Sequence, residues 1–153
     1  MKSDEVSAPR RRMTLRKAEK LRHRTLVDGL FAGGRTLYDY PLRATWKILS
    51  REEMQKSFRN GIPAHVAPLQ MLITVPKKKI RHAVDRVRIR RRIREAYRLN
   101  RLPLLETLNE HPGTYLQIGF IWLHKEEMDY AAIEKKMKRI IENLQKCVGS
   151  SHS

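Results

Sequence analysis

One segment of eighteen residues limits what this chain can fold into more than any other. Residues 83–100 read AVDRVRIRRRIREAYRLN, and their few apolar side chains recur at the spacing of an α-helix. At 100° per residue these apolar side chains form a single stripe, and most of the arginines fall on the opposite side. The stripe consists of Ile89, Ile93, Ala96 and Tyr97. The segment therefore predicts a helix that is attached to the protein by one face and displays guanidinium groups on the other.

The rest of the chain predicts strands and helices around this helix. Alternating apolar side chains predict three strands, at residues 40–49, 68–75 and 114–122. Amphipathic segments predict two further helices, over residues 23–32 and 129–148. Because helices lie between and after the strands, we expect an α+β fold. Its small mixed β-sheet would have the arginine-rich helix between strands and an amphipathic helix at the C-terminus.

Length and composition indicate one domain with short tails. We expect a single domain over residues 14–148, between a flexible basic tail at residues 1–13 and a flexible tail at residues 149–153. The polar stretch 50–67, with Asn-Gly and Pro63 and with Pro68 directly after it, predicts turns or a hairpin. The single cysteine, the absence of a long apolar run and the lack of a secretory signal predict a soluble, cytoplasmic protein without a membrane span. We also expect the free protein to be a monomer.

The net charge of +17 is concentrated in two segments. Residues 76–101 hold twelve Lys and Arg against two acidic residues, and residues 1–24 hold nine against three. The remainder of the chain is nearly neutral. On a soluble protein without a charged partner, positive and negative side chains are usually interspersed over the surface. This concentration of positive charge therefore indicates a polyanionic partner.

Nucleic acid fits this charge pattern better than an acidic membrane does. The basic segments lack the Trp, Phe and Leu side chains with which a helix lies in lipid. Arginine presents a rigid fork of donors that matches phosphate oxygens. A solvated helix face is the alternative, but such a face usually mixes signs, and here Glu95 is the main acidic neighbour. The charge does not choose between RNA and DNA.

The same segment resembles a known family. It is preceded by VPKKKIRH and contains Ala83-Val84, then Arg-Val-Arg at residues 86–88, an apolar residue and two arginines. In order and spacing this is similar to the protein subunit of bacterial ribonuclease P. Upstream, LVDGLFAGGR resembles the first helix of that family, with Phe31 and Gly34 at matching positions. The resemblance extends over about residues 15–141. The middle of the motif differs, because Val87 stands where the family usually has Asn.

The resemblance implies a ribonuclease P protein-like fold, also described as like domain 2 of ribosomal protein S5. It implies a subunit of an endoribonuclease that removes the 5′ leader of precursor tRNA, in which an RNA subunit performs the chemistry with Mg²⁺. Mg²⁺ would be bound mainly by that RNA, and no catalytic residue is expected in this chain. The sequence agrees, since its carboxylates are scattered and its six histidines lack metal-ligand spacing.

Two sets of residues follow from the resemblance. The arginine-rich helix and the lysines before it would dock on ribonuclease P RNA. The residues implied are Lys78, Lys79, Arg86, Arg88, Arg90, Arg91 and Arg94. A cleft beside the first helix would hold the single-stranded leader, through aromatic stacking and a nearby cation. The candidates are Phe31, Trp46 and Arg43. For both aromatic residues, a place in the hydrophobic core is an equally good interpretation.

Three other functions compete with this one. A ribosomal or rRNA-binding protein without a nuclease partner is the main alternative, because such proteins are also small and rich in arginine. A DNA-binding module is a second alternative, although no helix-turn-helix pairing is evident. A nuclease that acts without RNA is disfavoured, because the sequence shows no cluster of carboxylates.

Overall fold

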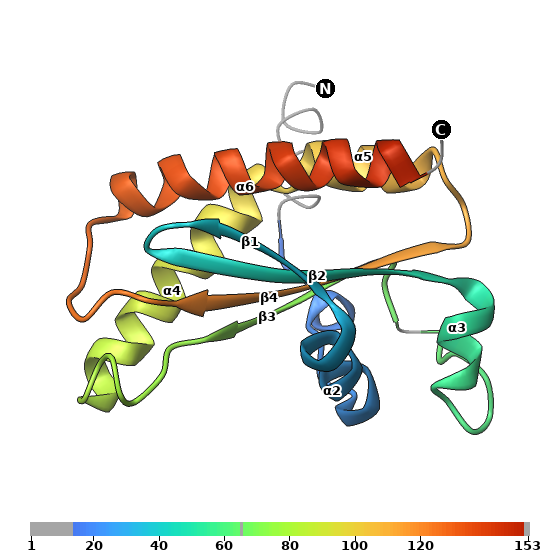
Figure 1. Cartoon of the computed structure of the whole chain (residues 1–153), viewed down its shortest axis with the longest axis horizontal. Helices are drawn as coiled ribbons and strands as arrows, with labels where there is room; N and C mark the ends of the chain where they lie inside the picture. The colour runs from blue at the N-terminus through green and yellow to red at the C-terminus, as the bar shows by residue number, and fades with distance from the viewer. Residues whose placement is uncertain (1–13, 65, 152–153) are drawn as a thin grey trace, which may run out of the picture.

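The computed structural model describes residues 14–64 and 66–151, in which helices are interspersed with strands along the chain (Figure 1). A 3₁₀ turn, η1, spans Lys17–Glu19 and precedes them. In chain order the elements are α2 (Arg24–Gly33), β1 (Arg35–Asp39), β2 (Leu42–Ser50), α3 (Arg51–Lys56), β3 (Leu69–Thr74), α4 (Ala83–Asn100), α5 (Leu102–Asn109), β4 (Thr114–Trp122) and α6 (Tyr130–Ser151).

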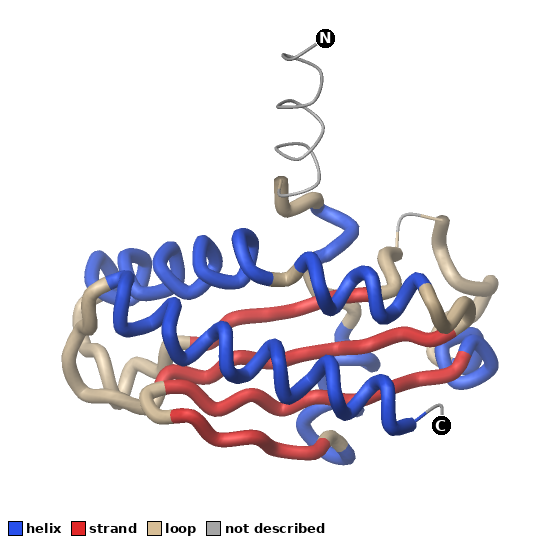
Figure 2. Tube along the Cα trace, turned by 90° about the horizontal axis from the view of Figure 1, so that it is seen from above, coloured by secondary structure: helices blue, strands red, loops and turns tan. Residues whose placement is uncertain are grey.

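The strands form one mixed sheet in the order β1-β2-β4-β3. β2 is antiparallel to both β1 and β4, whereas β3 runs parallel to β4. A parallel pair needs a long crossover, and here α4 and α5 supply it. Helices α4, α5 and α6 lie over one face of the sheet, as the view from above shows (Figure 2), and α2 lies against the other face (Figure 1). The predicted α+β class, with a small mixed sheet, is confirmed.

The main core lies between the sheet and α4, α5 and α6. The apolar stripe predicted for residues 83–100 is fully buried there, so the orientation expected for α4 is correct. The strands contribute alternate side chains to this core, as their period of two requires. Those of β2 and β4 are Leu42, Ala44, Trp46, Leu116, Ile118, Phe120 and Trp122.

A smaller core lies on the opposite face of the sheet. Leu26 and Leu30 of α2 pack there with Leu21, Leu49 and Met54. α2 has only ten residues, and it covers part of this face. The uncovered part of the sheet is therefore available for contacts with other molecules.

Three elements were not predicted from the sequence. The stretch 50–67 begins with a helix, α3, in place of the predicted turns or hairpin. A capping box starts α3, in which the Ser50 hydroxyl accepts from the Glu53 backbone N–H at 3.2 Å and the Glu53 carboxylate accepts from the Ser50 N–H at 3.0 Å. Helix α5 was missed because Pro103 suggested an interruption, but proline is well tolerated in a first turn. β1 was missed because only Leu37 of its five residues packs against the core.

Two flexible tails were predicted, at residues 1–13 and 149–153, and the structure bears on only the second of them. α6 continues through Ser151, so residues 149–151 are helical and do not belong to a flexible C-terminal tail. The predicted N-terminal tail at residues 1–13 lies outside the described residues. In the part of the chain that the structure covers, no helix combines the length and hydropathy needed to cross a bilayer.

Candidate nucleic-acid interface

The arginines of α4 divide into those bound to the protein and those that point away from it. Arg86 belongs to the first group, because its Nη1 donates to the backbone oxygens of Ile80 at 3.0 Å and Arg81 at 2.8 Å. These bonds hold the loop that precedes the helix. The guanidinium of Arg86 therefore stabilises the protein, although the sequence analysis assigned it to RNA.

Glu127, in the segment before α6, pairs with two arginines of α4. Arg88 Nη1 lies 2.8 Å from Glu127 and 3.3 Å from Asp85, and Arg92 Nη1 lies 3.3 Å from Glu127. The hydrogen bond that the Arg88 guanidinium donates to the Glu127 carboxylate raises the pKa of Arg88. Both pairs are partly exposed, so each contributes little to stability. They do, however, reduce the positive charge that this side of α4 presents.

The remaining predicted docking residues present their charges without partners. Within the described residues, no hydrogen bond or ion pair joins these side chains to the protein. They are Lys78, Lys79, Arg90, Arg91 and Arg94, five of the seven predicted. Unpaired guanidinium groups on successive turns repel one another, and bound phosphates would compensate for this repulsion.

Two exposed valines lie between these cations. Val84 and Val87 are among the large hydrophobic side chains exposed on the surface, and they border a shallow pocket with Arg88 and Arg91. Val87 is the residue that departs from the family motif. Its exposure means that the departure changes a contact surface and leaves the packing of α4 on the sheet unaffected.

Phe31 lies on the open face of the sheet, the one that carries α2. Its side chain is 42% exposed, so it is not a core residue. A Cβ placed on Gly119 of β4 would lie 2.9 Å from Phe31 Cζ, which shows how closely the ring covers this glycine. A larger residue at position 119 would displace the ring. The structure therefore holds a flat aromatic surface in place over β4.

Arg43 lies on the same face of the sheet, on β2, the strand next to β4. It pairs with Ile121, two positions along from the Thr45–Gly119 pair, so its side chain points to the side of the sheet that Phe31 covers. Its Nε is buried and has no hydrogen-bond partner among the described residues. A buried unpaired donor is costly, and a phosphate oxygen of a bound strand would satisfy it. Phe31 and Arg43, two of the three residues predicted to bind the leader, therefore lie on the same face of the sheet.

Trp46 was wrongly assigned to this surface. It pairs with Ile118, so it points to the opposite face of the sheet and packs in the main core, with 7% of its surface exposed. The guanidinium of Arg35 lies 5.8 Å from the centre of its ring. A base on the Phe31 side cannot stack on Trp46 because the sheet lies between them.

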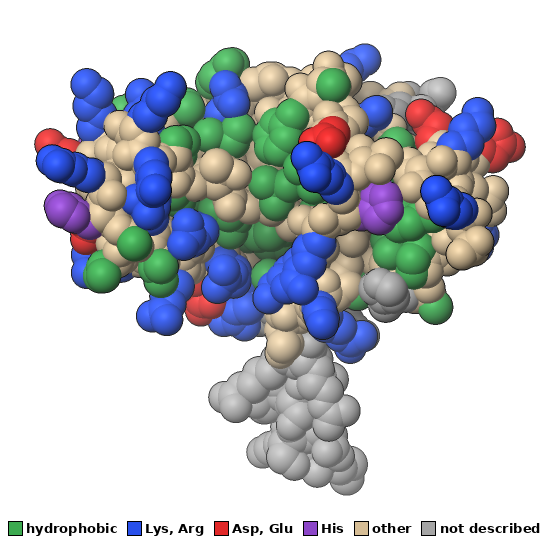
Figure 3. All heavy atoms as spheres, turned by 90° about the horizontal axis from the view of Figure 1, so that it is seen from below, with side chains coloured by type: hydrophobic (Ala, Val, Ile, Leu, Met, Phe, Trp, Pro, Cys, Tyr) green, Lys and Arg blue, Asp and Glu red, His purple; other side chains and the backbone are tan. Residues whose placement is uncertain are grey.

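Tyr38 is the aromatic residue that the sequence analysis missed. It lies on β1 directly opposite Arg43 and faces the same side of the sheet, and 65% of its surface is exposed. The residue could not be found from the sequence because β1 itself was not recognised. With it, the open face carries Tyr38, Arg43 and the Phe31 ring across three neighbouring strands. Figure 3 shows this face, with most Lys and Arg side chains toward its left and lower margins and hydrophobic side chains between them.

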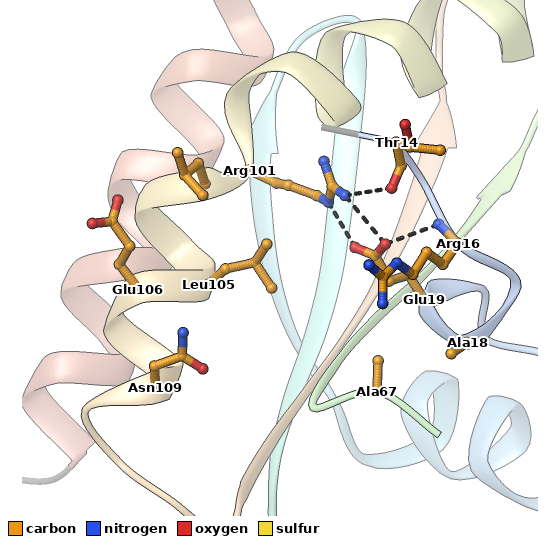
Figure 4. A pocket seen from close by; sticks show the side chains of 10 residues that line it. Thr14, Arg16, Ala18, Glu19, Ala67, Arg101, Leu105, Glu106 and Asn109 are labelled. Atoms are coloured by element: carbon orange, nitrogen blue, oxygen red, sulfur yellow. Dashed lines mark hydrogen bonds and ion pairs between the residues drawn. The ribbon is translucent and has the colours of Figure 1, made fainter. Parts of the chain in front are cut away.

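A buried ion pair joins the N-terminal segment to the end of α4. Arg101 Nε donates to Glu19 Oε1 at 2.7 Å, and Arg101 Nη2 donates to Glu19 Oε2 at 3.1 Å and to the Thr14 carbonyl at 3.1 Å. Figure 4 shows this pair beside a pocket of about 460 Å³ that is bounded on one side by Leu105 and Asn109 of α5. The pair fixes the chain that leads into η1 and α2.

No cluster of three or more His, Cys, Asp or Glu side chains suited to a metal ion occurs within residues 14–64 and 66–151. The acidic residues around α4 form ion pairs with arginines. The hydrogen bond that Arg98 donates to Glu95 lowers the pKa of Glu95. Two cationic or aromatic surfaces remain, the outward side of α4 and the open face of the sheet. Together with the fold, they define a small α+β protein that binds nucleic acid.

Comparison with known proteins narrows this class. A family model described as Ribonuclease P matches residues 15–145. The chain is 33% identical to the ribonuclease P protein component of Porphyromonas gingivalis (strain W83) over 137 residues, which cover 90% of each protein. It is 29% identical to that of Chlorobium phaeobacteroides, over 86% of this chain and 88% of the other. The solved RNase P protein of Staphylococcus aureus has a TM-score of 0.54 at 16% identity, over 84% of this chain and 96% of that one.

The chain belongs to the ribonuclease P protein family. It is the protein subunit of an endoribonuclease that matures the 5′ end of tRNA, and the catalysis lies in the RNA subunit. The ribosomal and DNA-binding alternatives are therefore set aside. The solved structure supports the same fold and, at its low identity, no more than the fold.

Proposed function

We propose that the outward side of α4 docks on ribonuclease P RNA and that the open sheet face holds the 5′ leader of precursor tRNA. The observation that carries the proposal is the set of five unpaired cations on α4 and the loop before it, beside arginines that the protein itself neutralises. Arginine forks bind phosphate oxygens in pairs, which suits the backbone of a folded RNA.

The leader would lie across β4, β2 and β1. Phe31 offers a stacking surface for one base, and Tyr38 offers a second, while Arg43 between them reaches a phosphate. Stacking on aromatic residues beside a basic track is the usual way in which proteins hold single strands. Because every base has an aromatic face, the leader would be bound with little sequence preference.

The protein would act by electrostatic compensation. The RNA subunit and the precursor both carry dense negative charge, and the cations of α4 reduce their mutual repulsion at the point where they meet. The Mg²⁺ ions of the reaction would then be bound mainly by RNA, and fewer of them would be needed. We expect the free protein to be a monomer in the cytoplasm, where its RNA partner is made.

The docking proposal is tested by the salt dependence of RNA-subunit binding. Arg91→Gln should lower the slope of log affinity against log salt by about 0.7–0.9, the value of one lost phosphate contact. Arg86→Gln is the matched control on the same helix. It should leave the slope unchanged and reduce thermal stability, because Arg86 holds backbone oxygens of its own loop. Equal slopes for wild type and Arg91→Gln would contradict the proposed docking side.

A further inference from the structure

A second group of cations converges at the outer edge of β3. A groove of about 220 Å³ lies there between α4 and the segment that leads into α2. Lys20 and Arg22 form one rim, and Arg90 and Arg94, one turn apart on α4, form the other. Its floor is apolar and comprises Leu15, Leu21, Met71, Leu72 and Ile73. Four cations from two distant parts of the chain thus surround one small groove.

The rim formed by Lys20 and Arg22 is held rigidly. The backbone around Lys20 forms a parallel bridge with Met71, and the Leu21 N–H donates to the Met71 carbonyl at 2.8 Å. Gln70 Nε2 donates to the Lys20 carbonyl at 3.4 Å. In extended backbone, successive side chains point to opposite sides. Since Leu21 is buried, Lys20 and Arg22 are both directed away from the core that Leu21 enters.

Among residues 14–64 and 66–151, no acidic side chain neutralises this groove. The residues that line it include no Asp or Glu, and the nearby Glu19 is bound to Arg101. None of the four cations has a hydrogen bond or an ion pair to a described side chain, in contrast to Arg88 and Arg92 on the other flank of α4. Four like charges fixed around one groove are unfavourable without an anion, and an RNA phosphate is an anion of suitable charge and size.

The groove is placed to meet the same RNA as α4. Arg90 and Arg94 lie on the helix turns that also carry Arg91, so an RNA surface resting on α4 reaches the groove as well. Phe31 covers Gly119 of β4, and Arg43 and Tyr38 lie further away on β2 and β1. With about 4.8 Å between strands, Tyr38 on β1 lies roughly 14 Å from the β3 edge. The leader surface therefore extends from β4 toward β1, away from the β3 edge where the groove lies.

We infer that Lys20 and Arg22, together with Arg90 and Arg94, form a phosphate-binding groove that seats the backbone of ribonuclease P RNA at the β3 edge. The inference rests on the proposed docking of α4 on that RNA. It adds a contact outside the arginine motif, from a segment more than sixty residues upstream, and it makes the docking surface continuous around the edge of the sheet.

The test measures binding of full-length protein to ribonuclease P RNA alone, over a range of salt concentrations. The variant is Lys20→Gln with Arg22→Gln, and the matched control is Lys135→Gln with Lys146→Gln, two exposed positions on α6. Both variants lose two positive charges. The groove variant should bind about tenfold more weakly at moderate salt, with a salt slope lower by roughly 1.4–1.8, and the control should change little.

A second arm distinguishes the RNA subunit from the leader. Holoenzyme is assembled with each variant at saturating protein, and the affinity for precursor tRNA is measured. We expect the groove variant to bind precursor as the wild type does. A loss confined to precursor with a leader would overturn the inference, because the groove would then hold the leader. Equal losses for the groove and control variants would also overturn it, since only net charge would matter. If wild type failed to bind the RNA, the proposed docking itself would fail.

Discussion

Arg101 is a fully buried cation, and Glu19 is its charged partner. The guanidinium also donates to the carbonyls of Thr14 and Arg98, and it lies 6.0 Å from the ring of Tyr97. A buried pair of this kind gains little over a hydrophobic pair of the same shape, but removing one partner leaves the other charged and desolvated. The pair therefore fixes the path of the N-terminal segment more than it adds net stability.

Arg101→Met should lower the free energy of unfolding by about 3–5 kcal/mol, because Glu19 is left buried without its partner. Chemical denaturation in urea measures this change. Arg98→Met is a suitable comparison, since Arg98 pairs with a half-exposed Glu95 and should cost about 1 kcal/mol or less. A similar small loss for both variants would show that Glu19 does not depend on Arg101.

Phe31 and Tyr38 make a different kind of contribution, because both rings are exposed in the free protein. Phe31→Ala and Tyr38→Ala should each weaken holoenzyme binding of precursor tRNA with a long leader by about 1–3 kcal/mol, the range for one stacked base. Binding of mature tRNA, which lacks the leader, should not change. Tyr40→Ala is the control, since the Tyr40 hydroxyl is bonded to His124 at 2.6 Å. Equal losses with mature tRNA would contradict a leader contact.

Acidic neighbours reduce the positive charge that helix α4 presents. Glu127 neutralises Arg88 and Arg92 from the segment before α6, and Arg98 is paired with Glu95. The cations left unpaired lie toward the start of the helix and the β3 edge. The RNA surface that α4 presents is therefore narrower than a count of its arginines suggests.

Glu127→Gln should release Arg88 and Arg92 and strengthen binding to ribonuclease P RNA by about three- to tenfold at moderate salt, with a steeper salt slope. The stability of the protein should fall by about 1 kcal/mol or less, because the pairs are partly exposed. Glu126→Gln adds the same charge at an exposed position and is the control. If Glu126→Gln strengthened binding as much, the effect would come from net charge and not from the released arginines.

The elements that the sequence predicted well share strong periodicity. The α4 stripe and the alternation in β2, β3 and β4 identified much of the main core, but not Leu104 and Leu108 of the unpredicted α5. β1, α3 and α5 carry five, six and eight residues, too few for a period to stand out. The same limit explains the errors at the site. Trp46 has the right residue type, but which face of the sheet it occupies relative to α2 is a tertiary property. The pairing of Arg88 with Glu127 is also a tertiary property, because the two residues are 39 positions apart in the sequence.

In the molecule as a whole, the main hydrophobic core and the unpaired cations lie in different places. The main core is formed by the sheet and three helices on one side, while the cations occupy the outward side of α4, the β3 edge and part of the open face. The two surfaces of the proposal would let one small domain contact two RNAs at once, the RNA subunit by α4 and the precursor by the sheet.

The most direct test of this account is leader removal from precursor tRNA at low Mg²⁺, with a bacterial ribonuclease P RNA and this protein together and separately. The account predicts efficient cleavage only with both components, little cleavage by the RNA alone at that Mg²⁺ concentration, and none by the protein alone. Raising Mg²⁺ should restore cleavage by the RNA alone. Cleavage by the protein without RNA, or no stimulation of the RNA by the protein, would contradict it.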